Sequence, residues 1–180
     1  SLNKVIKRKK ENILKIFVFN KMITLHIRSL NNVNIENILC SLAVIKILNL
    51  NLEKIKIFYK NLRPIEGRGK IHNIKRYKTN FKLIDESYNA NPLSVKKAII
   101  NFSKIKKNNF KKYVLLGDML ELGRKSNLFH KNLSKVINNT DIDKIFTYGD
   151  KIFTTYKHTN ENKRGNILQN RGDFDEVFSN

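Results

Sequence analysis

The chain has 180 residues and a formal net charge of +21, with 36 Lys and Arg against 15 Asp and Glu. This length accommodates one domain, or one domain and part of another, and excludes a typical multidomain enzyme. The single cysteine, Cys40, excludes an intrachain disulfide and a multi-cysteine metal site, and its apolar helical surroundings predict a small buried side chain. No apolar run reaches the roughly 18 residues of a membrane span and the start carries no signal-peptide pattern, so we expect a cytoplasmic protein.

The positive charge raises one functional alternative, a non-catalytic basic α/β module that binds nucleic acid by neutralising phosphates. The cations are mostly lysine, however, and they are scattered along the chain. Phosphate clamps and base readers favour the arginine fork, and the sequence has no aromatic and basic signature of a common RNA-binding module. Nucleic-acid binding is therefore kept as the alternative function, on charge alone.

The amino-terminal part of the sequence predicts a β-hairpin followed by two helices. Short apolar runs rich in β-branched residues predict strands over Ile13–Phe19 and Met22–Ile27, joined by a tight turn. Apolar residues from Asn34 to Leu48 cover much of the helical circumference, so we expect a helix that is buried on most sides. A second, amphipathic helix is expected over Leu52–Leu62, with Asn51 as its N-cap.

A proline and two glycines interrupt the helical pattern at Pro64–Gly69 and mark the clearest domain boundary. We expect residues 1–63 to be the end of one domain and residues 64–180 to form a second. Beyond the boundary, strands and helices alternate in the order typical of parallel βαβ units, which predicts an α/β fold with a Rossmann-like open sheet. The predicted strands are 71–77, 81–85, 113–116 and 144–148, and the predicted helices are 92–107, 126–139 and 151–156.

Two expectations concern the loops and the end of this second region. Ligands of open α/β sheets bind beyond the carboxyl ends of the strands, so the residues just after Ile84, Leu116 and Tyr148 are the candidates for a site. The polar segment from His158 to Gly172 is expected to be irregular, and a helix is expected to begin within Phe174–Phe178.

The strand-to-helix turn after Ile84 reads Asp85-Glu86-Ser87-Tyr88-Asn89-Ala90-Asn91-Pro92. Proline after asparagine predicts a helix start, with Asn91 as the N-cap. Carboxylates at a strand end can accept hydrogen bonds from ribose hydroxyls, and Asn side chains offer the paired donor and acceptor that suit an adenine edge. The alternative, which the residue types leave open, is that these side chains serve only as turn and capping residues.

This eight-residue run closely resembles the signature of the Mur ligases, in particular of the members called MurF that add D-alanyl-D-alanine to UDP-N-acetylmuramoyl-tripeptide. Three weaker matches follow the family order: Gly67-Arg68-Gly69 resembles the opening of the carboxy-terminal domain, Leu115–Gly123 with His130 resembles a strand-end loop and the next helix, and Asn37 resembles an asparagine that closes the central ATP-binding domain. Without the resemblance, Asp118 and Glu121 would be interpreted as a solvated turn, and His130 as an ordinary surface histidine.

The resemblance implies that the chain supplies the lid of an ATP-dependent peptide ligase of cell-wall synthesis. It implies ATP and Mg²⁺ as cofactors, UDP-N-acetylmuramoyl-tripeptide and D-alanyl-D-alanine as partners, and a monomer. Whether Asp85 or Glu86 is the key carboxylate stays open. The implied nucleotide-facing residues are Asn37, Arg68, Asp85, Glu86, Asn89 and Asn91, and the implied substrate-facing residues are Tyr88, Asp118, Met119, Glu121 and His130.

The sequence also departs from the family pattern. Val33 stands where the family usually has histidine, and the family's Lys-Gly-Ser-type segment is missing. No Gly-x-x-x-x-Gly-Lys-Ser/Thr loop occurs, so no part of this sequence is predicted to cradle a triphosphate. We therefore expect a fragment truncated on both sides, with a decayed copy as the alternative. It is expected to have no catalytic residue and no metal ligand of its own, and to be inactive by itself.

Overall fold

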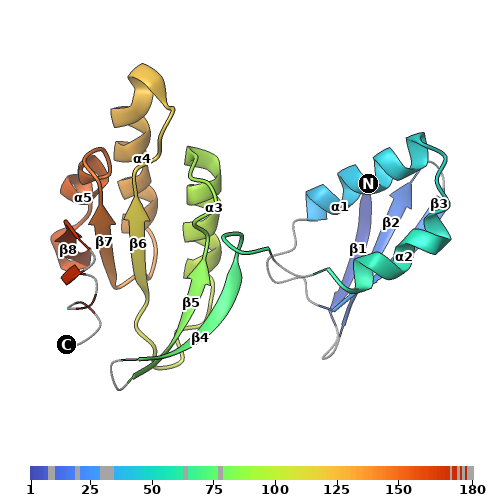
Figure 1. The fold of residues 1–180 in the computed structure, drawn as a ribbon, viewed down its shortest axis with the longest axis horizontal. Helices are drawn as coiled ribbons and strands as arrows, with labels where there is room; N and C mark the ends of the chain where they lie inside the picture. The colour runs from blue at the N-terminus through green and yellow to red at the C-terminus, as the bar shows by residue number, and fades with distance from the viewer. Residues whose placement is uncertain are drawn as a thin grey trace. The chain divides into compact units, whose positions relative to one another are not determined.

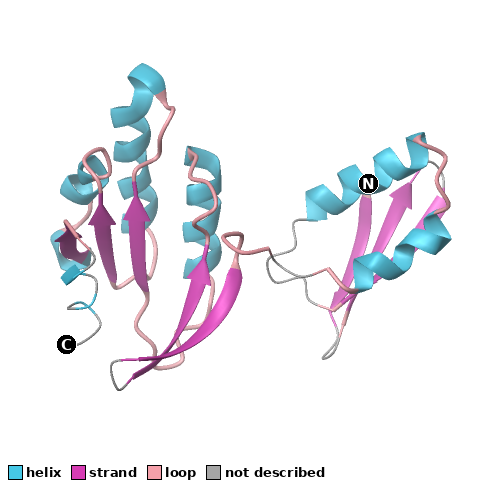
Figure 2. Cartoon of the chain, viewed as in Figure 1, coloured by secondary structure: helices cyan, strands magenta, loops and turns pink. Residues whose placement is uncertain are grey.

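The computed structural model describes residues 1–7, 11–18, 21–28, 35–62, 65–76, 79–170, 172–173, 175 and 177. It is a mixed α/β structure with open sheets (Figures 1 and 2). The chain divides into two compact units, the first formed by Ser1–His72 with Lys82–Glu86 and the second by Asn73–Phe81 with Ser87–Asn180. The boundary expected at residues 63 and 64 lies outside the described residues and stays a prediction.

The first unit contains a three-stranded antiparallel sheet in the order β1 (Leu2–Lys7), β2 (Asn12–Val18) and β3 (Lys21–Ile27). The predicted hairpin is confirmed by the register of β2 and β3, in which Leu14 faces Leu25. Both of these leucines are fully buried, because alternate residues of each strand face the core. Strand β1, with three polar residues among its six, was not predicted.

Two helices complete this unit, α1 (Ile35–Ile47) and α2 (Leu52–Lys60). The predicted N-cap of α2 is confirmed, because the side-chain oxygen of Asn51 accepts hydrogen bonds from the backbone N–H groups of the first turn. The core combines sheet and helix residues: Leu14, Ile16, Ile23, Leu25, Ile27, Ile38, Leu42 and Tyr59.

The expectation that the first helix is buried on most sides is wrong for α1. Its buried residues are Ile38 and Leu42, one helical turn apart, whereas Val44 is 52% and Ile47 70% exposed. Cys40 is exposed as well, so its predicted burial is also wrong. The physical reason is that apolar residues surround the helix, but the described part of this unit packs against only one stripe of them.

The second unit is built on a parallel sheet in the order β6 (Tyr113–Gly117), β7 (Lys144–Tyr148) and β8 (Arg164–Leu168). Helices α3 (Pro92–Ser103), α4 (Ser126–Asn138) and α5 (Phe153–His158) and the short 3₁₀ helices η1 (Gly123–Lys125) and η2 (Glu161–Lys163) connect and cover the strands (Figure 1). The predicted α/β class and parallel βαβ units are confirmed. The core of this unit consists of Ile99, Leu116, Met119, Leu133, Ile137, Ile142, Ile145 and Ile152.

Strands β4 (Lys70–Arg76) and β5 (Thr79–Asp85) pair as a separate two-stranded sheet. Both were predicted to within a few residues. The division of the chain passes through this pair, since residues up to His72 and from Lys82 to Glu86 belong to the first unit. Because β5 ends at Asp85, the eight-residue motif starts on the last residue of a strand.

The segment expected to be irregular contains β8, so that expectation is wrong. Strand β8 has only two large apolar residues, Ile167 and Leu168, and its polar start hides the strand pattern. Its order comes instead from parallel pairing with β7 and from two side chains that reach its backbone: Tyr156 Oη donates to Gly165 O at 2.9 Å, and Lys144 Nζ donates to Arg164 O at 2.9 Å.

Two predicted helices near the middle and the end of the chain can be compared with the structure. Helix α3 begins at Pro92 as expected but ends at Ser103 with Lys104 as its C-cap, four residues before the predicted end at Lys107. Much of the expected helix at Phe174–Phe178 lies outside the described residues. In the part of the chain that the structure describes, every helix is too short or too polar to span a membrane.

Candidate functional site

The Gly67-Arg68-Gly69 turn is tied to the end of β5 by Asp85. Gly67 and Gly69 have φ values of +73° and +80°, a region that favours glycine. Gly67 N–H donates to Asp85 Oδ2 at 3.0 Å, and Gly69 N–H donates to Asp85 O at 2.7 Å. Both glycines are buried while Arg68 between them is exposed. Asp85 therefore holds the backbone on both sides of Arg68.

Glu86, the next residue, is in a different electrostatic situation. Partial desolvation of its carboxyl group, together with the nearby negative charge of Asp85, raises the pKa of Glu86. The residue as a whole is exposed, and among the described residues no ion pair offsets its charge. The structure thus distinguishes the two carboxylates: that of Asp85 binds backbone, and that of Glu86 has no ion-pair partner within the described part of the chain.

The rest of the motif forms the turn into α3. Asn91 is the N-cap: its Oδ1 accepts from Leu93 N–H at 3.1 Å and from Ser94 N–H at 2.9 Å, and Ser94 Oγ accepts in return from Asn91 N–H at 3.2 Å. The capping prediction is confirmed for this residue. Tyr88 is 65% exposed and Asn89 is exposed, and whether they or Asn91 bind a nucleotide or substrate stays a prediction.

In the second unit, Asp118 joins the ends of two parallel strands. It directly follows β6, and its Oδ1 accepts a hydrogen bond from Ile152 N–H at 2.7 Å, in the loop after β7. Gly149 lies against the same carboxylate: it has a φ of +123°, and a Cβ atom there would lie 2.7 Å from the Asp118 carboxylate carbon. Glycine therefore permits a close approach that other residues would obstruct.

His130 on α4 holds the residue after Asp118. Its side chain is fully buried, which excludes the interpretation as an ordinary surface histidine. Nε2 accepts a hydrogen bond from Met119 N–H at 3.2 Å, and Nδ1 lies 2.9 Å from Ser126 O. The backbone of His130 also takes part: Thr155 Oγ1 donates to His130 O at 2.8 Å and links α4 to α5.

The remaining predicted residues differ in exposure. Met119 is 1% exposed and belongs to the core, so its side chain is not on the surface. Glu121 is exposed and has a φ of +59°, and Leu120 beside it is 64% exposed. Asn37 is exposed in the first turn of α1, and Val33 lies outside the described residues.

The predicted site residues therefore form two groups. The structure brings Arg68 and Asp85 together in the first unit, and Asp118, Met119 and His130 together in the second. Gly149 and Ser126 were missed among the individual residues. The location of Gly149 was accessible, because the loop after Tyr148 had been selected from the strand order, but its approach to Asp118 is a three-dimensional feature without a local sequence signal.

The described residues offer no metal site built from protein side chains alone. They contain no group of three or more His, Cys, Asp or Glu side chains that could hold a metal ion. The Asp85 and Asp118 carboxylates, which have the hard oxygen atoms that Mg²⁺ prefers, each accept a backbone N–H group instead. We therefore assign no metal-dependent step to these residues.

Sequence comparison decides the family. The family described as "Mur ligase, glutamate ligase domain" matches residues 68–171, which include the Asp85 turn, the Asp118 loop and His130. The chain belongs to the Mur ligase family. This Mur ligase chain is 36% identical over 116 residues to UDP-N-acetylmuramoyl-tripeptide--D-alanyl-D-alanine ligase of Buchnera aphidicola subsp. Baizongia pistaciae, an alignment that covers 64% of the chain and 24% of the relative. The chain thus spans about a quarter of the length of that relative.

Solved structures of Mur ligases share the fold. MurF ligase from Thermotoga maritima in complex with ADP superimposes with a TM-score of 0.72 at 19% identity, over 98% of this Mur ligase chain and 38% of that one. MurF from Acinetobacter baumannii gives a TM-score of 0.77 at 18% identity, over 98% of this chain and 37% of that one. At these identities the likeness establishes the fold alone.

Proposed function

We propose that this chain is part of an ATP-dependent ligase that adds D-alanyl-D-alanine to UDP-N-acetylmuramoyl-tripeptide in cell-wall synthesis. The observation that carries the proposal is the motif Asp85–Pro92, at the turn between β5 and α3 inside the matched family region. A relative with this ligase's name, 36% identical over 116 residues, supports the same substrates. The proposal implies a cytoplasmic monomer whose partners are these two substrates.

The proposed reaction has two group transfers. The tripeptide carboxylate attacks the γ-phosphorus of ATP, which forms an acyl phosphate and releases ADP. The amine of D-alanyl-D-alanine then attacks the acyl carbon and loses a proton, and the tetrahedral intermediate expels inorganic phosphate as the amide forms. A lid that excludes water would protect the acyl phosphate from hydrolysis.

In this reaction we assign the chain a binding and positioning role. Arg68, exposed between two anchored glycines, suits a phosphate or ribose oxygen because the guanidinium is always charged and forks onto oxygen pairs. Asp85 would act through Arg68, since its carboxylate accepts the Gly67 N–H group. Glu86, Asn89, Asn91 and Asn37 are the further proposed nucleotide residues. Tyr88 and Glu121 are the proposed substrate contacts, and Asp118, Met119 and His130 are proposed to hold the loop that presents Glu121.

Nucleotide affinity tests the first assignment. Calorimetric titration of the complete protein with ADP and ATP should give a Kd that Arg68→Ala raises by about tenfold, as expected for the loss of a charge-assisted hydrogen bond. Arg28→Ala is the matched control, because Arg28 is an exposed arginine just after β3. Asp85→Ala should weaken binding as Arg68→Ala does, whereas Asp85→Asn keeps an oxygen that can accept from Gly67. Additive losses in the Arg68 and Asp85 double variant would contradict action through Arg68.

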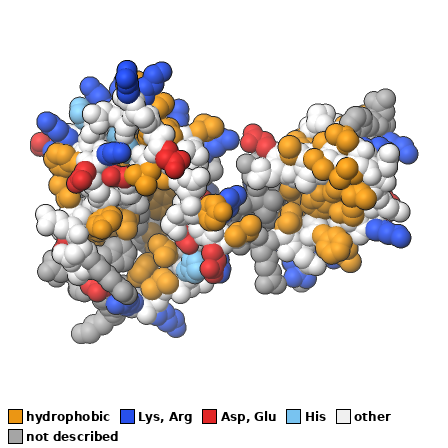
Figure 3. Space-filling view, turned by 45° about the horizontal axis from the view of Figure 1, so that its top comes forward, with side chains coloured by type: hydrophobic (Ala, Val, Ile, Leu, Met, Phe, Trp, Pro, Cys, Tyr) orange, Lys and Arg blue, Asp and Glu red, His pale blue; other side chains and the backbone are white. Residues whose placement is uncertain are grey.

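A ligase assay on the complete protein tests the substrates. Release of inorganic phosphate from ATP should require both UDP-N-acetylmuramoyl-tripeptide and D-alanyl-D-alanine, and a single amino acid should not replace the dipeptide. Phosphate release with a different amine would indicate a family member with another acceptor. The nucleic-acid alternative requires cations that gather on one face, whereas in Figure 3 the Lys and Arg side chains of the second unit lie scattered among other residues.

A further inference from the structure

The loop that follows β6 is anchored at two successive residues. The Asp118 carboxylate accepts the Ile152 N–H group at 2.7 Å, and the Met119 N–H group donates to His130 Nε2 at 3.2 Å. The side chains of Met119 and His130 are 1% and 0% exposed, so the second of these hydrogen bonds is shielded from water. A buried N–H group that loses its acceptor pays a desolvation cost, which makes this bond important for the loop's position.

The partners of His130 determine its tautomer. Ser126 O can only accept, so Nδ1, 2.9 Å away, must carry a proton and donate it. Met119 N–H can only donate, so Nε2 must be unprotonated. These two contacts are satisfied together only by the neutral imidazole with its proton on Nδ1, because a proton on Nε2 would face another donor.

The two anchors leave other side chains of the loop at the surface. Leu120 is 64% exposed and Glu121 is exposed with a φ of +59°, directly after the anchored Met119 amide. Parallel α/β sheets bind ligands at the carboxyl ends of their strands, which is where this loop begins. The chemistry presented there is an apolar side chain beside a carboxylate, which suits a small peptide with apolar side chains and a free amine.

We propose that His130 is a positioning residue: its neutral imidazole fixes the Met119 amide and thereby places Leu120 and Glu121 to contact the incoming D-alanyl-D-alanine. The contact with the dipeptide rests on the proposed function, whereas the role of His130 in holding the loop does not. His130 itself does not touch the substrate in this proposal, because its ring is fully buried.

Nuclear magnetic resonance of the intact chain tests the tautomer directly. The imidazole ¹⁵N shifts of His130 should be those of a protonated Nδ1 and an unprotonated Nε2, with a correlation from the Met119 amide to Nε2. A protonated Nε2, or the absence of any coupling to Met119, would overturn the proposal. This measurement needs no variant, so it remains decisive even if substitutions at His130 prevent folding.

Hydrogen exchange of the backbone amides tests the positioning role. His130→Leu fills the buried position with an apolar side chain that has no hydrogen-bond acceptor. It should speed exchange of the Met119 amide by about tenfold or more. His130→Gln offers a side-chain oxygen in place of Nε2 and should restore much of the protection. Ser126→Ala is the matched control: it removes the hydroxyl 3.4 Å from Nδ1 but keeps the carbonyl that accepts from Nδ1, and should leave Met119 unchanged.

Amides of the central strand β7 separate positioning from general destabilisation. If His130→Leu accelerates exchange of the Ile145 and Phe146 amides as much as that of the Met119 amide, the residue has only a packing role and the proposal is wrong.

In the ligase assay on the complete protein, His130→Leu, Leu120→Ala and Glu121→Gln should each raise KM for D-alanyl-D-alanine several-fold and leave KM for ATP unchanged. If the complete protein is inactive but shows the expected exchange pattern, the ligase function is rejected and the role of His130 in holding the loop is kept. If the protein is an active ligase and the variants leave KM for the dipeptide unchanged, the substrate contact is rejected.

Discussion

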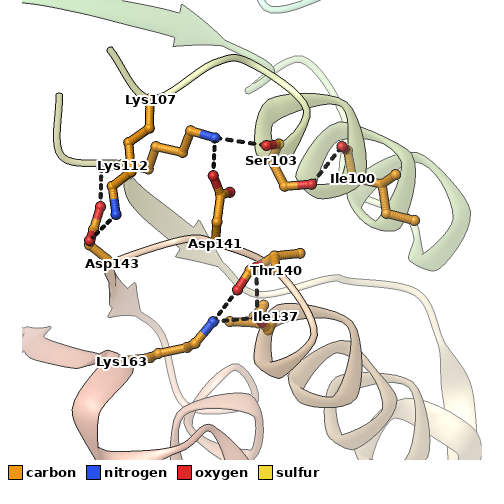
Figure 4. A network of polar contacts seen from close by, with 9 residues as sticks. All are labelled: Ile100, Ser103, Lys107, Lys112, Ile137, Thr140, Asp141, Asp143 and Lys163. Carbon is orange, nitrogen blue, oxygen red and sulfur yellow. Dashed lines mark hydrogen bonds and ion pairs between the residues drawn. The ribbon is translucent and has the colours of Figure 1, made fainter. Parts of the chain in front are cut away.

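The two ends of the β6–β7–β8 sheet use polar residues in opposite ways. At the amino ends, the residues just before the three strands are Lys112, Asp143 and Lys163. Lys112, only 4% exposed, donates through Nζ to Asp141 Oδ2 and Ser103 O, both at 2.7 Å. Asp143 accepts from Lys107 Nζ at 2.5 Å and from Lys112 N–H at 2.7 Å (Figure 4).

Lys163, at the same ends of the strands, has partners of its own: its Nζ donates to the carbonyl oxygens of Ile137 and Thr140 at the end of α4. In Figure 4 these side chains come from the end of α3, the segment before β6, the loop before β7 and the last residue of η2. Each of these charged groups therefore has a partner among the described residues.

At the carboxyl ends the polar groups hold backbone instead of one another. Asp118 and His130 each accept one N–H group, from Ile152 and Met119, and the exposed side chains of the loop are left for other contacts. The difference teaches that the densest ionic network of a fold need not mark its functional site. Compensated charges stabilise the sheet, and anchored loops with uncommitted side chains are where binding is expected.

Substitution of Gly149 should produce the largest effect. Gly149→Ala forces a Cβ to within 2.7 Å of the Asp118 carboxylate at a φ of +123°, and should lower the free energy of unfolding by about 3 kcal/mol, which urea denaturation would measure. Gly123→Ala is the control, since Gly123 also has a positive φ of +55° but no atom within 4 Å of the added methyl, and should cost about 1 kcal/mol. Equal losses would mean that the contact with Asp118 is unimportant.

A substitution in the network at the amino ends of the strands should cause the second-largest loss of stability. Lys112→Met removes a nearly buried cation and should destabilise the chain by about 2 kcal/mol, less than for a fully buried pair because Asp141 is 47% exposed. The affinity of the complete protein for D-alanyl-D-alanine should not change, because this network lies at the end of the sheet opposite the candidate loop. Lys131→Met, at an exposed position of α4, is the control for stability. A loss of affinity without a loss of stability would break the contrast between the two ends.

The helix cap within the motif should give a smaller effect. Asn91→Ala removes the acceptor for two N–H groups of α3 and should cost about 1 kcal/mol in thermal or urea denaturation. Asn89→Ala, two residues earlier and exposed, should be close to neutral for stability. If Asn89→Ala lowers nucleotide affinity and Asn91→Ala does not, then Asn89 binds the nucleotide and Asn91 only caps α3.

The sequence was most informative where a pattern is local. The hairpin of β2 and β3, the caps Asn51 and Asn91, and the alternation of strands and helices after Gly69 follow from residue types at fixed spacing. It failed at β8 and on the outer side of α1, where pairing with β7 and the extent of the neighbouring surface decide the outcome. The Gly149 approach to Asp118 and the buried acceptor of His130 join residues distant in sequence, so spacing alone did not predict them.

Two carboxylates should give opposite and smaller dependences of stability on pH. Burial alone would raise the pKa of Asp143, but hydrogen bonds from Lys107 and from the Lys112 backbone, together with the positive charges nearby, hold it below its ordinary value. A depressed folded-state pKa stabilises the protein above the unfolded value, so this contribution should be lost as pH falls below about 4. Lys107→Met should flatten that part of the stability curve.

For Glu86 the sign is reversed, because burial and the charge of Asp85 raise its pKa in the folded protein. The folded state then holds the proton more tightly than the unfolded state. Stability therefore falls as pH rises from the ordinary pKa of about 4.5 through the raised pKa of the folded protein, and stays lower above it. Glu86→Gln should therefore be more stable than the original chain at pH 7 and equal to it near pH 3 in urea titrations. A variant that loses stability at pH 7 would show that the Glu86 charge is compensated, and would remove the electrostatic contrast between this strand end and the amino ends of the parallel sheet.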